Sequence, residues 1–101
     1  MPIYLDPTSL EGQPLILHSI GDADFAVRVA DHAAGRIMAK PISGGRRVWF
    51  WTLTGPSLPT DLQPSHGEAE TLLTAKAALR AKFNAWMAWA KARGHPVLWR
   101  G

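Results

Sequence analysis

The four histidines are the residues with the widest chemical range in this sequence, and their spacing predicts no shared site. They stand at His18, His32, His66 and His95, and no pair has the spacing of a zinc motif. The chain has no cysteine, which excludes thiolate ligands and disulfides. We therefore expect scattered, surface or half-buried imidazoles, with no metal and no cofactor.

Other residues that could do chemistry also lack a catalytic setting. Ser43-Gly44-Gly45 is followed by arginine and a strand-forming run, not by the Lys-Ser/Thr and helix of a phosphate-binding loop. Asp22 and Asp24 flank a turn, where aspartate commonly hydrogen-bonds its own backbone. No nucleophile elbow, paired carboxylate or zinc signature is present. The sequence predicts a protein that is not an enzyme.

The element that must position any functional surface is the aromatic stretch of residues 46–54, which ends before Gly55-Pro56. Both of its alternating faces are largely apolar, which is typical of a strand in the middle of a sheet with at least one face covered. One face carries Trp49, Trp51 and Leu53, and the other carries Val48, Phe50 and Thr52.

Three segments upstream of this stretch also have the character of strands. Residues 14–20 form the first, residues 24–30 alternate cleanly with Phe25, Val27 and Val29 on one side, and residues 36–40 alternate again. We expect Gly21-Asp22 and residues 31–35 to form the turns, with Gly35 supplying a positive φ. Because connections this short join antiparallel neighbours, residues 14–54 are predicted to form a β-meander.

A long amphipathic helix is predicted over residues 71–93. Apolar residues recur at three- and four-residue steps, Thr71 suits the N-cap, and Gly94 suits the position just past the end. Ser65 with Glu68 also fits a capping box, which leaves open a start one turn earlier. The stripe predicted to face the sheet comprises Leu72, Ala75, Leu79, Phe83, Trp86 and Ala90.

The rest of the single domain is irregular in this interpretation. Residues 1–13 read as an arm with at most a short strand, and residues 55–70 as a Pro/Gly-rich loop without periodicity. Residues 94–101 form a tail whose Val97-Leu98-Trp99 is a last strand or a plug. The helix is about 33 Å long, so its far end is expected to overhang the sheet.

One group of residues could form an interaction surface. If the Trp51 side of the sheet lies under the helix, the opposite face presents cations interleaved with apolar side chains, a composition that suits nucleic acid or a homodimer contact. Trp89 adds an aromatic ring at the edge of the helical stripe. The candidate interaction residues are Arg28, Arg36, Met38, Lys40, Arg46, Val48, Phe50 and Trp89.

The charge is distributed unevenly along the basic chain. Residues 1–70 carry a net charge of −3, whereas residues 71–101 hold six basic residues and no acid, within a total of +3. A C-terminal third of one sign is compatible with an acidic partner such as nucleic acid. The alternative is that a basic helix simply sits on a mildly acidic sheet.

The order of these motifs resembles a group of small bacterial proteins without a characterised function. The resemblance rests on Gly35-Arg36-Ile37-Met38, on the run from Trp49 to Pro56, and on Thr71-Leu72 with Ala75-Lys76-Ala77-Ala78-Leu79-Arg80 and Trp86. It covers roughly residues 25–89. It implies a β-meander followed by one helix and implies no activity. The N-terminal arm and the tail lie outside it.

The sequence thus predicts an α+β domain with a three- to four-stranded antiparallel meander packed against one C-terminal helix. We expect a non-catalytic interaction protein that self-associates as a homodimer through apolar surface. The alternative is a nucleic-acid binder that uses the basic sheet face (Arg28, Arg36, Lys40, Arg46) and the basic helix. The N-terminus lacks the features of a signal peptide and no apolar run approaches about 20 residues, which predicts a cytoplasmic protein with no membrane or small-molecule partner.

Overall fold

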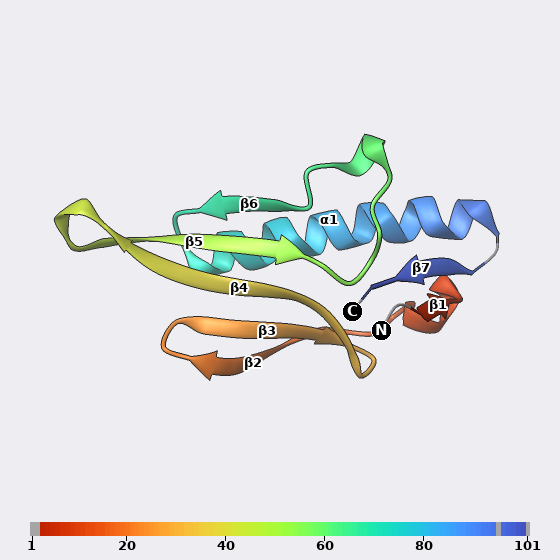
Figure 1. Cartoon of the computed structure of the whole chain (residues 1–101), viewed down its shortest axis with the longest axis horizontal. Helices are drawn as coiled ribbons and strands as arrows, with labels where there is room; N and C mark the ends of the chain where they lie inside the picture. The colour runs from red at the N-terminus through yellow and green to blue at the C-terminus, as the bar shows by residue number, and fades with distance from the viewer. Residues whose placement is uncertain (1–2, 95, 101) are drawn as a thin grey trace.

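The chain is an α+β domain built from a five-stranded antiparallel sheet, a separate two-stranded sheet and one long helix (Figure 1). The computed structural model describes residues 3–94 and 96–100. The large sheet holds β2 (Leu15–Gly21), β3 (Asp24–Val29), β4 (His32–Ile42), β5 (Arg46–Leu53) and β6 (His66–Ala69), side by side in chain order. The small sheet pairs β1 (Ile3–Leu5) with β7 (Val97–Trp99). The helix α1 spans Leu72–Arg93. The class predicted from sequence is confirmed, with one more strand in the meander than expected.

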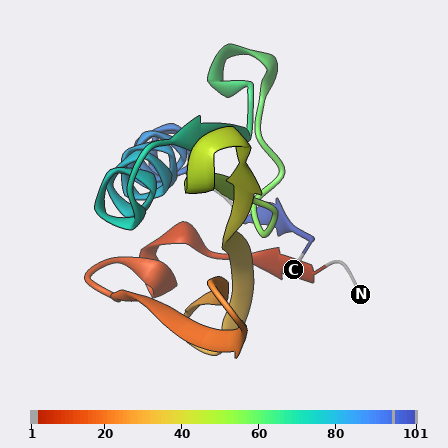
Figure 2. The same ribbon diagram turned by 90° about the vertical axis from the view of Figure 1, so that its left-hand side faces the viewer.

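The aromatic strand β5 and the helix bury each other's apolar side chains. Trp51 and Leu53 lie in one core cluster with Leu79 and Phe83 of α1. The register sets Ile37 of β4 beside Trp51, so the predicted face of the sheet is the covered one. Viewed end-on, α1 lies against one side of the sheet (Figure 2). Since β5 has a neighbour on each side and a helix over one face, its apolar character on both sides is explained.

The helix begins and ends where its sequence predicts. The Thr71 hydroxyl accepts a hydrogen bond from the Thr74 backbone N–H at 3.1 Å, and Gly94 has the left-handed conformation with φ +73°. The alternative start one turn earlier is wrong, because Glu68 lies in β6 and Ser65 precedes that strand. Within the described ranges, no helix combines the length and the apolar composition that crossing a membrane requires.

The C-terminal half of α1 is covered by the two ends of the chain. The short strand allowed in the N-terminal arm and the last strand predicted over Val97-Leu98-Trp99 are both present, and they pair with each other. The 3₁₀ turn η1 (Pro7–Leu10) inserts the side chain of Leu10 into the core, and β7 adds Trp99. The Trp86 and Trp99 rings meet edge to face with centroids 5.6 Å apart. The overhang expected for the helix is therefore closed by β1, η1 and β7 rather than left open (Figure 1).

The turn predicted at residues 31–35 is wrong in position. The chain reverses at Ala30 and Asp31, both with positive φ, and β4 already begins at His32. Gly35 lies inside β4 instead, where a Cβ atom would stand 2.1 Å from the carbonyl oxygen of Thr52. The glycine is thus required by close approach of β5, not by a turn.

The loop predicted over residues 55–70 contains a 3₁₀ turn, η3 (Thr60–Leu62), and the strand β6. The sequence of β6 is His-Gly-Glu-Ala, which has no strand-forming residue, so the strand exists only by pairing with β5. The pairing sets Gly67 opposite Trp51, whose indole lies against the glycine backbone.

Candidate interaction surfaces

The face of the large sheet turned away from α1, here called the outer face, carries seven of the eight candidate residues. Register places Arg36 beside Thr52, Met38 beside Phe50 and Lys40 beside Val48. Arg28 lies at the other end of the face, and Arg46 lies at the start of β5. The alternation predicted for these strands is therefore confirmed. Residues that alternate with the candidates and point to the other face are buried, among them Val27, Val29, Ile37, Trp51 and Leu53.

The outer face is mixed in charge rather than uniformly basic. The Arg36 guanidinium donates to both carboxylate oxygens of Asp24, at 2.9 and 2.5 Å. These hydrogen bonds, with the attraction between the two charges, lower the pKa of the Asp24 carboxyl from its ordinary value of 3.8. Glu68 of β6 lies directly beside Phe50. Two carboxylates thus stand among the cations of this face.

The aromatic ring of the outer face is also occupied. The Lys40 ammonium lies over Phe50, 5.5 Å from the ring centroid. Phe50, Met38 and Val48 are each half-buried. Arg28 donates to the carbonyl oxygen of Asp31 and so supports the β3–β4 turn. A stacking platform needs free aromatic faces, and Phe50, the phenylalanine of this face, is already covered by a cation.

Trp89 belongs to a different part of the molecule from the other seven candidates. It lies on α1 beside a depression formed with Tyr4 of β1 and Leu98 of β7. The guanidinium of Arg93 stands over its indole, 4.8 Å from the centroid. The structure therefore places seven of the eight predicted residues on one face of the sheet and the eighth on the helix.

Large exposed apolar side chains gather at a place that sequence reasoning missed, the edge strand β2. Ile16 and Ile20 are 48% and 57% exposed. β2 is the first strand of the sheet, and none of its seven residues is Asp, Glu, Lys or Arg. The sequence shows that this strand of seven residues carries no charge, but it does not show that the strand lies at the edge of the sheet.

The inner side of β2 borders an apolar groove. Leu15 and Leu17 form one wall, and α1 forms the other with Leu73, which is 75% exposed. The groove has a volume of 240 Å³, with Lys76 and Arg80 on the helical side. It exists because α1 packs mainly over β5 and β6 and leaves the β2 side of the sheet uncovered.

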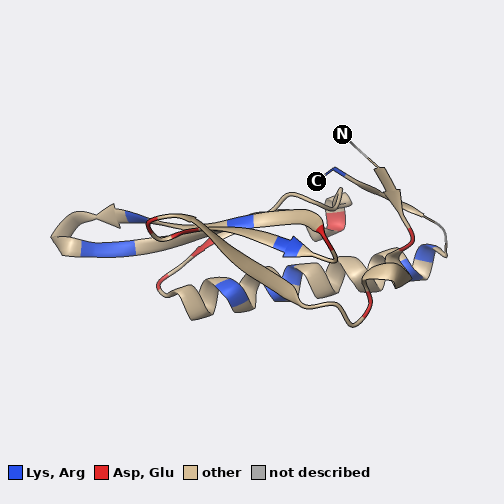
Figure 3. Cartoon of the chain, turned by 90° about the horizontal axis from the view of Figure 1, so that it is seen from below, with Lys and Arg blue, Asp and Glu red and all other residues tan. Residues whose placement is uncertain are grey.

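A second projecting feature is the end of the β4–β5 hairpin, residues 40–48, here called the β-ribbon. Neighbouring strands stop short of it, since β3 pairs no further than Met38 and β6 no further than Trp49. Residues 40–42 pair only with residues 46–48, and Gly44 and Gly45 close the tip with positive φ. Figure 1 shows this ribbon extending from the body, and Figure 3 shows blue Lys and Arg segments on both of its strands.

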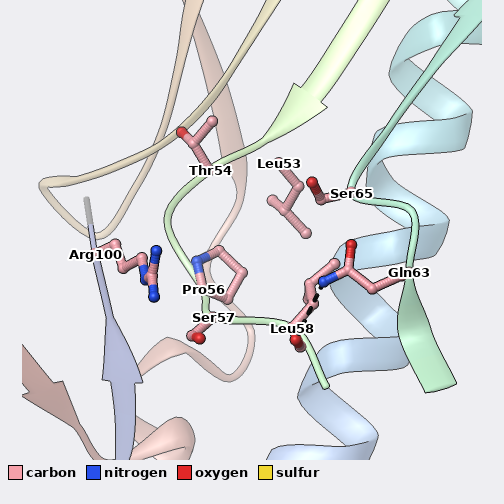
Figure 4. Close-up of a pocket in the computed structure, with 8 residues that line it drawn as sticks. All are labelled: Leu53, Thr54, Pro56, Ser57, Leu58, Gln63, Ser65 and Arg100. Carbon is pink, nitrogen blue, oxygen red and sulfur yellow. Dashed lines mark hydrogen bonds between the residues drawn. The ribbon is translucent and has the colours of Figure 1, made fainter. Parts of the chain in front are cut away.

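The pocket in Figure 4 opens below the end of β5, where residues 55–65 fold over the core. It has a volume of 420 Å³, and Arg100 is the charged residue of its described lining. The Gln63 side-chain amide donates to the carbonyl oxygen of Leu58 at 3.2 Å and is directed along the loop. The lining residues are Leu53, Thr54, Pro56, Ser57, Leu58, Gln63, Ser65 and Arg100. A single cation among hydroxyl, amide and apolar groups does not supply an acid–base pair.

The histidines do not converge among the described residues. His18 and His66 lie at opposite edges of the outer face, in the row that runs through Ala26, Arg36 and Thr52. The His32 ring packs against Trp99, and His95 lies outside the described residues. Across residues 3–94 and 96–100, no three His, Cys, Asp or Glu residues are grouped as a metal site requires.

The fold and its surfaces define a small α+β module with one uncharged sheet edge and one basic β-ribbon. In comparisons with known proteins, the chain matches no protein-family model, no curated protein and no solved structure.

Proposed function

We propose that this chain is a non-catalytic interaction module that self-associates by pairing of β2 with β2 of a second copy. The observation that carries the proposal is the uncharged edge of the sheet, with its exposed isoleucines Ile16 and Ile20. Edge strands normally carry charge, proline or a bulge that prevents pairing with another chain. β2 has a register irregularity between Ser19 and Gly21, at one end, and an uncharged run before it.

A second copy of this chain suits the edge better than an unrelated surface does. The outward N–H and C=O groups of an edge strand are satisfied by another extended strand. In a two-fold antiparallel pair each residue meets residues of the same segment, so a charged strand would oppose like charges. β2 carries no charge to repel itself. An axis at His18 sets Ile16 of one copy near the register irregularity at Ile20 of the other.

The apolar groove between β2 and α1 would also form part of this interface. Leu15 and Leu17 line the groove immediately behind the paired edge, together with Leu73 of α1. Continuation of the sheet into a second copy extends this apolar floor. The half-buried outer-face residues Met38, Val48 and Phe50 offer less exposed apolar surface than β2 does.

The test is the mass of the chain in solution as a function of concentration, measured by sedimentation equilibrium. We expect a reversible dimer for the wild type. The double variant Ile16→Lys/Ile20→Lys is expected to be monomeric, because lysines at this edge oppose each other and remain hydrated. Ile42→Lys is the matched control, since Ile42 is 44% exposed and lies in the β-ribbon. A monomeric wild type, or an equal effect of the control, rejects the proposal.

Cross-linking tests the geometry separately. Because the chain has no cysteine, His18→Cys introduces a single thiol at the proposed axis. Residues directly opposite in an antiparallel pair lie within the range that a disulfide spans. We expect rapid oxidation to a covalent dimer for His18→Cys and slow oxidation for Ile42→Cys. A reversal of that order would exclude β2 as the contact. Cytoplasmic location and kinship with the small bacterial proteins described above remain predictions.

A further inference from the structure

We infer that the β-ribbon of residues 40–48 is a nucleic-acid-binding element that enters a groove of a double helix. The inference does not depend on self-association, because β2 and the β-ribbon lie in different parts of the sheet. The proposed nucleic-acid contact is confined to this projecting segment and does not extend over the whole outer face.

The β-ribbon carries a concentrated positive charge. The hairpin formed by β4 and β5 carries Arg36, Lys40, Arg46 and Arg47, and the chain has no acid between Asp31 and Asp61. Arg36 is paired with Asp24, which leaves three cations on the β-ribbon itself. Arg47 lies 3.7 Å from Asp22, whose side chain is almost fully exposed, and such a surface pair is weak. The net charge of residues 40–48 is +3, concentrated on a segment nine residues long.

These cations are distributed over both faces of the β-ribbon. Alternation along the strands puts Lys40 and Arg46 on the outer face and Arg47 on the opposite one. A groove of a double helix has a phosphate strand on each side, so cations on two faces of an inserted element meet phosphate on both. A flat anionic membrane surface would contact the cations on only one of these faces.

The shape of the β-ribbon also suits a groove of a double helix. The major groove of B-form DNA, about 12 Å wide, admits a two-stranded β-ribbon. Residues 40–48 form such a ribbon without flanking strands, and its tip is narrow because Gly44 and Gly45 have no side chains. Ile42 is exposed near the tip, and apolar residues at such positions contact thymine methyl groups or wedge between base steps. Because phosphates supply most of the contact, binding is expected to depend weakly on sequence.

The experiment is fluorescence polarisation of a labelled 20-base-pair DNA duplex titrated with the full chain at several salt concentrations. The test variant is Lys40→Ala/Arg46→Ala/Arg47→Ala. The control is Lys76→Ala/Arg80→Ala/Arg100→Ala, which changes the net charge equally with three exposed cations elsewhere. Circular dichroism melts establish that both variants are folded.

We expect the ribbon variant to lose at least about tenfold in affinity and to reduce the slope of log affinity against log salt by roughly 0.9 for each cation removed. The control variant is expected to change both quantities much less. An equal loss in the two variants would mean that net charge alone drives binding, which overturns the inference. No salt-sensitive binding by the wild type overturns it as well. Ribbon-dependent binding to vesicles of anionic lipid without binding to the duplex would identify a membrane surface instead.

Discussion

The indole N–H of Trp99 donates a hydrogen bond to the carbonyl oxygen of Ala33 at 3.0 Å. This bond joins the last strand of the chain to the beginning of β4, and the Trp99 ring also packs edge to face on Trp86 of α1. Gly55 lies under the same ring, where a Cβ atom would stand 2.3 Å from it. Trp99 therefore connects the small sheet, the large sheet and the helix through one side chain.

Substitution of Trp99 should separate the contribution of this bond from that of the ring. Trp99→Ala is expected to lower the free energy of unfolding by about 3–5 kcal/mol, as for other buried aromatic truncations. Trp99→Phe keeps an aromatic ring but removes the N–H, which leaves the Ala33 carbonyl without its partner and costs about 1–3 kcal/mol. Urea unfolding followed by circular dichroism measures both. If Trp99→Phe equals the wild type, the hydrogen bond contributes nothing net.

Trp51→Ala should show which face of β5 is interior. Trp51 is 7% exposed and packs in the core with Phe83, so Trp51→Ala and Phe83→Ala are each expected to cost about 3–5 kcal/mol in urea unfolding. Leu73→Ala removes an apolar side chain that is 75% exposed and should stay within about 0.5 kcal/mol of the wild type. A silent Trp51→Ala would contradict the packing of the sheet under the helix.

Gly35→Ala should be among the most destabilising small substitutions in the sheet. The added methyl group would meet the Thr52 carbonyl oxygen at 2.1 Å, and backbone cannot move away as a flexible side chain does. We expect a loss of about 1–3 kcal/mol or more in thermal or urea unfolding. Gly21→Ala is the control, because its added Cβ meets only the Asp24 side chain at 3.6 Å. Similar losses in the two variants would show that the close approach to β5 is not the cause.

Substitution of Gly94 should destabilise the chain through backbone strain at its positive φ rather than through a steric clash. Its φ is +73°, and nothing lies within 4 Å of an added Cβ. Gly94→Val is expected to cost about 1–2 kcal/mol, and hydrogen exchange of the last turn of α1 should accelerate. Gly94→Asn should be milder, since asparagine tolerates the left-handed region. If valine and asparagine behave alike, conformational strain is excluded as the reason.

The Asp24–Arg36 ion pair should add an acid-dependent component to stability. The hydrogen bonds from Arg36 lower the pKa of Asp24 in the folded chain below 3.8, so the carboxylate favours folding above that pH. This contribution is lost as the pH falls below 3.8 toward the folded pKa. Asp24→Asn should therefore be less stable than the wild type at about pH 7, with a difference that shrinks by about pH 3. The Arg36 side chain is about half exposed, and Arg36→Ala should change stability little.

The measurement for this pair is urea unfolding at both pH values. Asp22→Asn, which removes the same charge from the neighbouring turn, is the control. An unchanged difference between Asp24→Asn and the wild type across the two pH values would show that the ion pair is not its source.

Much of this architecture was determined locally, and the sequence alone therefore predicts it. The bounds of α1 follow from Thr71, the apolar stripe and Gly94, because caps and amphipathic period act within a few residues. The buried face of β5 follows from strict alternation, since a strand with Trp51 inside must also place Leu53 inside. The candidate residues of the outer face follow from the same alternation.

Only the tertiary structure decided which strand lies at the edge, which residues stand beside each other and what closes the end of the helix. β6 has no intrinsic strand preference and forms because β5 offers it a partner. The sequence predicts Gly35 to be a turn residue, because glycine is suited both to turns and to close backbone contacts. The contact with Thr52 joins residues that are distant in the sequence, so the sequence does not reveal it. The uncharged run of β2 became a candidate interface only when the sheet left one of its sides unpaired. These features depend on pairing between distant segments, which local sequence does not encode.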